Sequence, residues 1–352
     1  MTQVTFTKQH PIAMWEVGME FEDPFIIESV TRRQRKSGEP YVVLELADRT
    51  GRTEGTIWDD LEYFDQRGYK RDQYVLVKGS VTEYNGKLKA TIRFMRPLSA
   101  EQVRPEDFVP ISPRPVHELE ELFRHRIAMV EDSEFSNLLN LLFHPKGDIW
   151  RDFRMAPSAR MVHQAYIHGL IEHTINVTDN ALALASAPHN APLIHRDLLI
   201  TGALVHDIGK IVEYRWLPRI DYTETGLLLG HISIGAFLVG EAARLLNIES
   251  GRLAHLIHLI LSHHGRLEYG SPRTPATAEA MILHYADYAD AQLAVYDELA
   301  QEARNKGEQV SAYSSFIERR VLLPTAASKG DAFGNRYLNN LAELITADQQ
   351  ET

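Results

Sequence analysis

Residues 204–210 read Leu-Val-His-Asp-Ile-Gly-Lys, a stretch that sets three chemically active side chains close together. The run before it, from Arg196 to Val205, has helical spacing of apolar residues, so His206 and Asp207 are expected at the end of a helix. Lys210 stands four residues after His206, about one helical turn along. An imidazole, a carboxylate and an ammonium group are therefore expected to point to one place.

Histidine is concentrated around this stretch. Of the 16 histidines in 352 residues, 12 fall between His163 and His284. Further potential ligands follow one another at intervals of about one helix plus a connection: His173, His206, Asp207, His231, His263, His264 and Asp287. A helical bundle can bring such side chains to a common centre from different helices. A mixed shell of imidazole and carboxylate suits a divalent ion such as Mn²⁺, Fe²⁺, Zn²⁺ or Mg²⁺.

Each of these residues also has a purely structural interpretation. A single histidine on an apolar helix is more often a packed, hydrogen-bonded side chain than a ligand. That interpretation is kept for His255 and His258, which lie on the apolar run Leu253–Leu261. For the ordered set of seven, packing would have to be the explanation at every position independently. The set as a whole therefore favours a metal centre, in which Asp207 can bridge two ions.

The first hundred residues have a different pattern, that of short strands. The predicted strands are Phe25–Val30, Pro40–Leu46, Arg52–Trp58, Gln73–Tyr84 and Lys87–Phe94. A helical insert is expected after the third, and Asn85-Gly86 gives a tight hairpin turn between the last two. Five short strands in this order predict a small Greek-key barrel of the OB type. Tyr41 and Trp58, interleaved with basic residues, are candidates for stacking on the bases of a single strand, with a core position as the equal alternative.

The chain is therefore expected to join an N-terminal all-β OB-type barrel to an all-α helical bundle. The predicted divisions are a barrel at 12–98, a proline-rich linker at 99–115, a helical connector at 116–155, a histidine-rich bundle at 156–305, and a C-terminal helical extension with a tail at 306–352. Within the extension, helices are predicted over Ser314–Val321 and Arg336–Thr346.

Composition narrows the function classes. The chain has no cysteine, which excludes disulfides, thiol catalysis and Cys-ligated zinc. The net charge is −11, but residues 1–100 hold 15 basic and 15 acidic residues, so the acidic excess lies entirely in the remainder. No stretch without a charged residue is longer than Thr225–Gly240, which is too short to span a bilayer comfortably, and the N-terminus lacks the apolar core of a secretion signal. A cytoplasmic enzyme without a membrane partner is expected.

Several runs resemble one family closely. They include Ala156–Arg160, Val162–Thr174, Leu204–Lys210, Leu229–Ile232, Ser262–Pro272 and Leu283–Ala291, with Tyr41–Gly51 and Gly55–Asp59 in the barrel. The ordered ligands are the signature of the HD superfamily of metal-dependent phosphohydrolases, and the runs resemble the YhaM-type 3′→5′ exoribonucleases, which pair an OB barrel with an HD domain. Gln164, where a second histidine is expected, and His168, where a small residue is expected, depart from the family pattern.

The resemblance implies a site. His173, His206, Asp207 and Asp287 would hold one ion, and His231, His263 and His264 a second, with Asp207 between them. Manganese is expected, with Fe²⁺, Mg²⁺, Co²⁺ or Zn²⁺ as alternatives and one or two ions. Asp207 and Lys210 would be catalytic. Arg160, His163 and Arg266, together with Tyr41 and Trp58 of the barrel, would contact the substrate.

The activity implied is hydrolysis of single-stranded RNA, with DNA as a further substrate, from the 3′ end to nucleoside monophosphates. Assembly into a homo-oligomer is expected, and the apolar run Leu227–Val239 could serve a subunit interface as easily as a core. Two alternatives stay open. One is a nucleotide or cyclic-dinucleotide phosphohydrolase, although cyclic-di-GMP phosphodiesterases carry Gly-Tyr-Pro after the paired histidines where this chain has Gly265-Arg-Leu. The other is a non-catalytic nucleic-acid-binding regulator.

Overall fold

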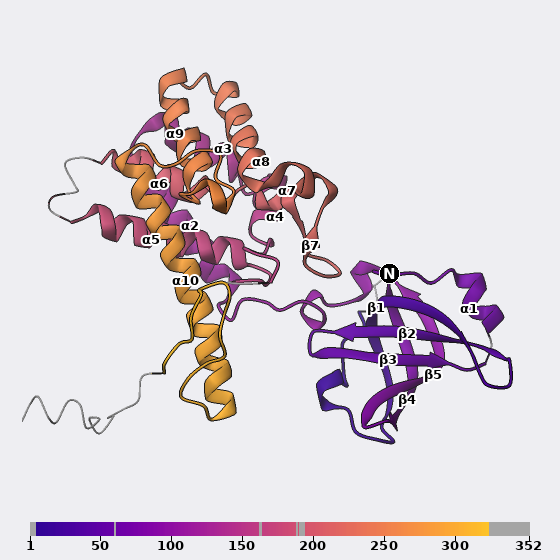
Figure 1. The fold of residues 1–352 in the computed structure, drawn as a ribbon. Helices are drawn as coiled ribbons and strands as arrows, with labels where there is room; N and C mark the ends of the chain where they lie inside the picture. The colour runs from indigo at the N-terminus through magenta and orange to yellow at the C-terminus, as the bar shows by residue number, and fades with distance from the viewer. Residues whose placement is uncertain (1–4, 60, 162–163, 188, 190–193, 324–352) are drawn as a thin grey trace, which may run out of the picture. The chain divides into compact units, whose positions relative to one another are not determined.

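The computed structural model describes residues 5–59, 61–161, 164–187, 189 and 194–323. The chain divides into two compact units, Met1–Asp290 and Ala291–Thr352. The first contains a β-barrel and a helical bundle, in that order along the chain (Figure 1). The predicted fold class, an OB-type barrel followed by helices, is confirmed.

The barrel is closed and has the strand order β1-β2-β3-β5-β4. Its elements are β1 (Glu20–Gln34), β2 (Pro40–Asp48), β3 (Gly51–Ile57), α1 (Leu61–Arg67), β4 (Tyr74–Tyr84) and β5 (Lys87–Leu98), preceded by a 3-10 turn η1 (Ile12–Met14). The strands β3 and β5 pair in parallel and all other neighbours are antiparallel. Alternate residues such as Phe25, Leu44 and Val75 fill the interior and are fully buried.

The first strand is much longer than the predicted Phe25–Val30. Residues of β1 from Glu20 to Ile26 pair with β4, and those from Ile26 to Gln34 pair with β2. The register shifts between Ile27 and Ser29, where the strand passes from one neighbour to the other. Burial alternates only at the start of β1, is continuous from Asp23 to Ile27, and is lost after Val30, so no single period spans the whole strand.

The rest of the described chain is largely helical. The elements are η2 (Ala100–Gln102), η3 (Pro105–Asp107), α2 (Val116–Ala128), α3 (Ser133–Leu142), α4 (Asp148–Phe153), α5 (Gly169–Ala185), α6 (Arg196–Val205), α7 (Lys210–Glu213), β6 (Tyr214–Arg215), β7 (Asp221–Tyr222), α8 (Glu224–Leu245), α9 (Ser250–Ser262), η5 (Leu267–Tyr269) and α10 (Ala278–Lys306). One continuous core holds α2 to α9 together, with Phe123, Phe143 and Phe153 fully buried and their rings in contact. The helix ends that this core fixes carry the side chains of the candidate site.

The helix α8 is interrupted near its start. Gly230 has φ 68° and ψ 154°, which breaks the helix immediately before His231. Within the described residues, α8 is the one helix whose length and composition would suffice to cross a membrane, a test that core helices of globular proteins also pass. Part of α8 packs against α7 and α9, which accounts for some of its apolar residues.

The predicted helix over Ser314–Val321 is wrong. The backbone there forms a hairpin-like ladder, with antiparallel bridges between Val310 and Leu322 and between Ser314 and Arg319. Glu318 has a positive φ of 53°, which a helix does not tolerate. The second predicted helix, Arg336–Thr346, lies outside the described residues.

Candidate metal centre

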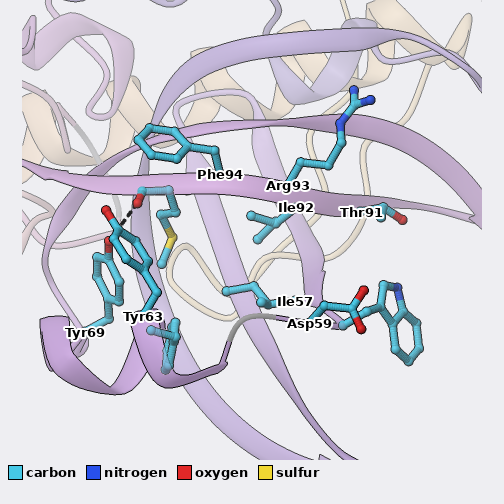
Figure 2. A pocket seen from close by; sticks show the side chains of 11 residues that line it. Ile57, Asp59, Tyr63, Tyr69, Thr91, Ile92, Arg93 and Phe94 are labelled. Carbon is cyan, nitrogen blue, oxygen red and sulfur yellow. Dashed lines mark hydrogen bonds between the residues drawn. The ribbon is translucent and has the colours of Figure 1, made fainter.

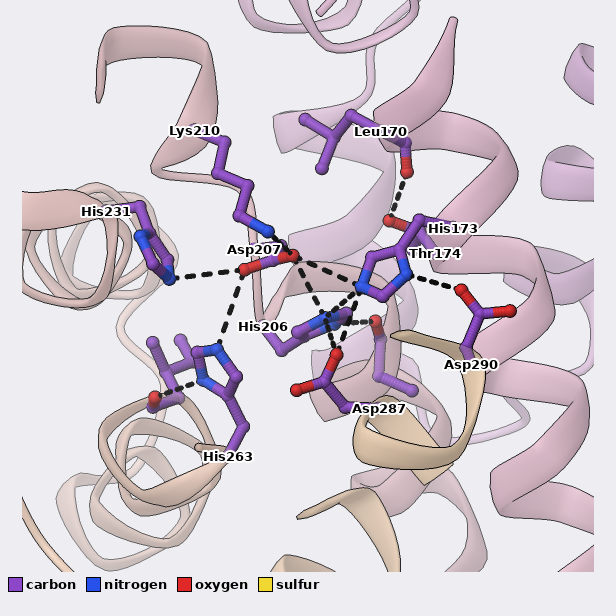
Figure 3. Close-up of polar contacts among 12 residues, drawn as sticks. Leu170, His173, Thr174, His206, Asp207, Lys210, His231, His263, Asp287 and Asp290 are labelled. Atoms are coloured by element: carbon purple, nitrogen blue, oxygen red, sulfur yellow. Dashed lines mark hydrogen bonds and ion pairs between the residues drawn. The ribbon is translucent and has the colours of Figure 1, made fainter. Parts of the chain in front are cut away.

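The seven potential ligands come from five helices and meet around Asp207, and Figure 3 labels all of them except His264. His173 lies in α5, His206 and Asp207 follow the last residue of α6, and His231 follows the break in α8. His263 and His264 follow α9, and Asp287 lies in α10. His173, His206, Asp207 and His263 are buried, and the remaining three are partly accessible.

One carboxylate oxygen of Asp207 faces the first group of side chains. Its Oδ2 lies 3.3 Å from Nε2 of His173 and 3.3 Å from Nε2 of His206. Asp287 completes this group, with its Oδ1 3.1 Å from Nε2 of His173. The ammonium of Lys210 lies 2.5 Å from the same Oδ2 of Asp207. The four side chains other than Lys210 are the ones that the resemblance assigns to one ion.

The other carboxylate oxygen of Asp207 faces the second group. Its Oδ1 lies 3.5 Å from Nε2 of His231 and 3.5 Å from Nε2 of His263. The ring of His264 lies beside both, with ring centroids 5.1 Å from His231 and 4.4 Å from His263. Each of two triads, His173-His206-Asp207 and His231-His263-His264, offers donor atoms within 4.8 Å of one another. Asp207 thus has one oxygen toward each group.

All five imidazoles are held by the nitrogen that faces away from Asp207. Nδ1 donates to a backbone carbonyl in His206 (Ala203, 2.7 Å), His263 (Ile260, 2.7 Å) and His264 (Tyr269, 2.8 Å). In His173 and His231 it meets a carboxylate, that of Asp290 at 2.7 Å and that of Glu213 at 3.0 Å. A carbonyl oxygen can only accept, so a neutral ring held this way presents the lone pair of Nε2. This is how metal-binding histidines are commonly oriented.

Three buried atoms at the centre lack a hydrogen-bond partner among the described residues: Oδ1 of Asp207, Nε2 of His231 and Nε2 of His263. A buried polar atom without a partner costs about 1–3 kcal/mol. These three atoms converge on one place. Carboxylate oxygens and imidazole nitrogens are ligand atoms that divalent first-row metals bind. The residues present therefore fit a divalent cation.

The electrostatics of the first group also favour a cation. Burial alone would raise the pKa of Asp207, but Lys210, His206 and His173 together hold it well below its usual range. Burial would also raise the pKa of Asp287, but its hydrogen bond to His173 and the charges of His173, His206 and His263 together hold that pKa below its usual range. Burial would lower the pKa of His173, yet its bonds to Asp207, Asp287 and Asp290 raise it well above the usual value. Three carboxylates around one imidazole form a strongly cation-attracting pocket.

The second group differs because fewer carboxylates reach it. Burial lowers the pKa of His263. Burial and the neighbouring His263 and His231 lower the pKa of His264 to about 3. Both rings are therefore neutral at physiological pH, which is the form that binds metals.

The sequence did not single out two carboxylates of this site, Asp290 and Glu213. Asp290 accepts from Nδ1 of His173 and from the amide of Gln164 at 3.0 Å. Glu213 accepts from the backbone N–H and from Nδ1 of His231, and its pKa is lowered by that contact in spite of burial. Their spacing was the available signal: Asp290 follows Asp287 by three residues on α10, and Glu213 follows Lys210 by three on α7.

Three residues of the bundle were predicted to contact the substrate: Arg160, His163 and Arg266. The guanidinium of Arg160 lies 3.7 Å from Asp221 and over the ring of Tyr222, not against the seven ligands. Arg266 follows the paired histidines, and its guanidinium lies 5.8 Å from the ring centre of Tyr269. His163 lies outside the described residues.

The barrel carries an aromatic pocket of about 470 Å³, bounded by the end of β3, the helix α1 and β5 (Figure 2). Trp58 lies at its rim and stacks on Tyr41 at 4.8 Å between ring centres, with the guanidinium of Arg35 5.0 Å from its ring. Phe94 and Tyr63 face each other across the pocket at 6.5 Å. Both Trp58 and Phe94 are exposed to solvent.

Comparison with known proteins gives one family match in the helical bundle and one in the barrel. A family model for the HD domain matches residues 170–292, and one for the OB-fold nucleic acid binding domain matches residues 28–98. The chain is 33% identical over 315 residues to the 3′-5′ exoribonuclease YhaM of Bacillus subtilis (strain 168), covering 89% of this chain and 98% of that protein. It is 32% identical over 294 residues to the protein of the same name from Geobacillus sp. (strain WCH70), covering 83% and 89%.

Among solved structures, a domain of replication protein A from Methanococcus maripaludis is similar to this chain at a TM-score of 0.22 with 19% identity, over 25% of this chain and 93% of that one. The HD match spans all seven potential ligands, and the OB match spans Tyr41 and Trp58.

Proposed function

This chain belongs to the family of the YhaM 3′-5′ exoribonucleases, and from that membership we propose that it removes nucleotides from the 3′ end of single-stranded RNA with the help of divalent cations. The observation that carries the proposal is the placement of Asp207, with one oxygen toward each of two groups of imidazoles. A site of this kind suits phosphodiester hydrolysis, in which charge develops on the phosphate and an attacking water must lose a proton.

We assign His173, His206, Asp207 and Asp287 to one cation and His231, His263 and His264 to a second, with Asp207 shared. When bound, divalent cations of this kind supply positive charge to the phosphate and lower the pKa of water. Manganese is the ion we expect, because a shell of imidazoles and carboxylates suits it. The carboxylates of Asp290 and Glu213 keep His173 and His231 turned so that Nε2 faces the cations.

Lys210 supplies a fixed positive charge beside the cations. Its side chain is buried, and its ammonium lies 2.5 Å from Asp207. It stands at the start of the short helix α7, one turn beyond His206, so it cannot move far from the centre. We propose that it donates to a non-bridging oxygen of the scissile phosphate. Arg266, three residues after His263, and Arg160 are the candidates for the adjoining phosphate.

The barrel holds the strand in this proposal. Trp58, stacked on Tyr41 and flanked by Arg35, offers the combination of ring face and positive charge on which single strands are held without regard to sequence. The acidic excess of the chain lies after residue 100, so the barrel itself does not repel a polyanion. RNA is the proposed substrate, and single-stranded DNA is the natural comparison.

The test is degradation of 5′-labelled single-stranded RNA by the purified protein in the presence of Mn²⁺. A ladder that shortens from the 3′ end, with release of nucleoside monophosphates, is expected. Asp207→Ala should remove the activity and still retain RNA, since the barrel is untouched. RNA that stays intact with Mn²⁺, Fe²⁺, Mg²⁺, Co²⁺ and Zn²⁺ contradicts the proposal, and turnover of cyclic dinucleotides or free nucleotides in its place favours a small-molecule phosphohydrolase.

We also propose that identical subunits associate through α8. Its exposed residues include Leu227, Leu228, Leu229, Phe237 and Leu245, an unusual number of apolar side chains for one helix. Light scattering after gel filtration should give a mass above that of one chain, and Phe237→Glu should reduce it. A single-chain mass for the unchanged protein at every concentration contradicts this assignment.

A further inference from the structure

A second aromatic pocket lies beside the metal centre. It has a volume of about 320 Å³, and the loop after α9, the turn η5 and the first turns of α10 form its walls. The residues that give it its character are Gly265, Arg266, Tyr269, His284, Tyr285 and Tyr288. A volume of this size is at the lower end of the range for small-molecule sites, roughly 300–1,000 Å³, and suits one nucleoside rather than a run of them.

Two segments of the chain contribute residues both to the pocket and to the metal centre. Along the loop, Gly265 and Arg266 directly follow the potential ligands His263 and His264. Along α10, His284 and Tyr288 flank Asp287, three residues before it and one after it. The imidazole of His284 closes the gap, because its Nδ1 donates to the carbonyl of His263 at 2.9 Å. A nucleotide with its phosphate at the centre therefore has its base within reach of this pocket.

Gly265 makes this arrangement possible. Its φ is +77°, and a Cβ at this position would lie 2.2 Å from the ring of His284. Any other residue would push the imidazole away from the backbone of the paired histidines. The ring of His284 is thus held flat against the loop, where it forms part of the pocket wall.

The walls are aromatic and open to solvent. Tyr269, Tyr285 and Tyr288 are 51%, 62% and 43% exposed, although their rings gather around one cavity. The ring of His284 lies 5.1 Å from that of Tyr285 and 6.1 Å from that of Tyr288. Arg266 adds a positive charge, and none of the described lining residues is acidic. Exposed rings with a guanidinium at the rim are the features that accept an unstacked base.

We propose that this pocket seats the base of the 3′-terminal nucleotide while its phosphodiester is hydrolysed. The inference rests on the proposed exonuclease activity and adds the subsite that recognises the end of the strand. A base is free to enter such a pocket only when it is unpaired, so the same contact selects single strands over duplexes. The rings of Tyr285 and Tyr288 are the main stacking surfaces, and Arg266 lies where the sugar-phosphate enters.

The experiment compares two RNAs that differ only at the 3′ end, one with a normal terminal nucleotide and one with an abasic terminal sugar. For each, kcat/KM for removal of the terminal unit is measured with the unchanged protein and with Tyr285→Ala, Tyr288→Ala and the matching Phe variants. The unchanged protein should prefer the base-bearing end by about tenfold or more, since stacking of one base has an effect of this size.

The alanine variants should lose about tenfold on the base-bearing RNA, and their preference for the base should shrink toward unity. The phenylalanine variants keep the ring and should keep the preference. Tyr313→Ala removes an equally exposed tyrosine that lines none of the described pockets and should behave as the unchanged protein. Alanine variants that retain the full preference for a terminal base overturn the inference.

A binding measurement separates this inference from the proposed activity. By calorimetry with Mn²⁺ present, adenosine 5′-monophosphate should bind more tightly than ribose 5-phosphate, and the difference should vanish in Tyr285→Ala and Tyr288→Ala. If the unchanged protein leaves RNA intact, the exonuclease proposal fails and this comparison still decides the pocket. If RNA is degraded but the two ligands bind equally, the pocket assignment fails alone.

Discussion

Asp207 connects the two groups of imidazoles, and its surroundings show how one residue serves both. Its two oxygens face different histidines, and Lys210 restrains the carboxylate from one side. The carboxylate is buried and ionised, so leaving it without positive charge nearby would be energetically costly. The orientation of His173 and His231 depends in turn on the carboxylates that meet their Nδ1 atoms.

Glu213 and Asp290 test that dependence. Glu213→Gln keeps an acceptor for His231 but removes the charge, and Asp290→Asn does the same for His173. Each should weaken Mn²⁺ binding by about 10–100-fold, with activity recovered at high Mn²⁺ concentration. Calorimetric titration of the metal-stripped protein measures the affinity, and Glu224→Gln, an exposed carboxyl in the first turn of α8, is the matched control. Equal affinity in Glu213→Gln and the control would reduce Glu213 to a packing role.

At this scale the sequence singled out the candidate ligands but not the residues that orient them. His206, Asp207 and the paired His263-His264 stand out because the ordered spacing is rare. Glu213 and Asp290 do not, because carboxylates are common and their role arises only from the Nδ1 atoms opposite them. The role predicted for Arg160 stays a prediction, and in the structure its guanidinium lies 3.7 Å from Asp221.

At the scale of elements, the close approach of α7 and α8 sets the position of His231. Gly209 ends the loop after Asp207 and lies directly against α8, so a Cβ there would be 2.0 Å from the backbone oxygen of His231. The break at Gly230 lets α8 turn so that His231 points back to Asp207. Backbone contact between the two segments therefore replaces side-chain packing where the site needs them closest.

Two glycine substitutions should consequently have opposite effects. Gly209→Ala must push α8 away and should destabilise the protein by about 1–3 kcal/mol, with weaker Mn²⁺ binding. Gly240 lies in α8 with open space around the position of a Cβ. Gly240→Ala should therefore stabilise the protein by about 0.5–1 kcal/mol. Chemical unfolding monitored by circular dichroism measures the free energy of unfolding of both variants. If Gly209→Ala is as stable as the unchanged protein, the contact at Gly209 relaxes at no cost.

Periodicity predicted most elements and failed where tertiary contacts dominate. The span Arg196–Val205 was predicted with the bounds of α6, because an apolar run there ends at the first polar ligand. The single-turn helix α7 carries too few residues for any period to show. At Ser314–Val321 the backbone pairing of Ser314 with Arg319 overrode a composition that is compatible with a helix.

At the scale of the whole molecule, two separate cores support two tasks. The barrel interior, with Phe25 and Leu44, and the bundle core, with Phe123 and Leu199, are distinct clusters. The sequence revealed this organisation readily, since strand-like alternation gives way to helical spacing after a proline-rich stretch. It could not show which aromatic residues of the barrel face solvent, because alternation does not distinguish the inside of a closed barrel from its rim.

Removal of the cation should affect the two cores unequally. In the proposed assignment the cations bind residues of the folded bundle, so a chelator should lower the melting temperature of the bundle alone. Saturation at a hundredfold excess over Kd corresponds to about 2.7 kcal/mol of stabilisation. Calorimetric scans with and without EDTA measure this, and a chelator effect on both transitions or on neither contradicts the assignment.

Trp58→Ala should weaken the binding of RNA by the barrel without affecting the hydrolysis step. Loss of one stacking surface should raise KM for a long RNA by about tenfold and change kcat little, whereas a dinucleotide substrate should be unaffected. Trp58→Phe keeps a ring and should retain most of the affinity. Kinetics on both substrates at fixed ionic strength give the comparison, and an equal loss on the dinucleotide would place Trp58 in another role.

The exposed walls of the pocket beside the centre have an evolutionary consequence. Tyr269 and Tyr285 contribute to no core, and substitutions of exposed residues usually change stability by less than about 0.5 kcal/mol. In the role proposed for this pocket, stability therefore does not constrain these two tyrosines, whereas Gly265 and the buried imidazoles are held by the geometry of the centre. Homologous enzymes that share the same chemistry can in this way drift apart in which end groups they process fastest, without passing through a misfolded ancestor.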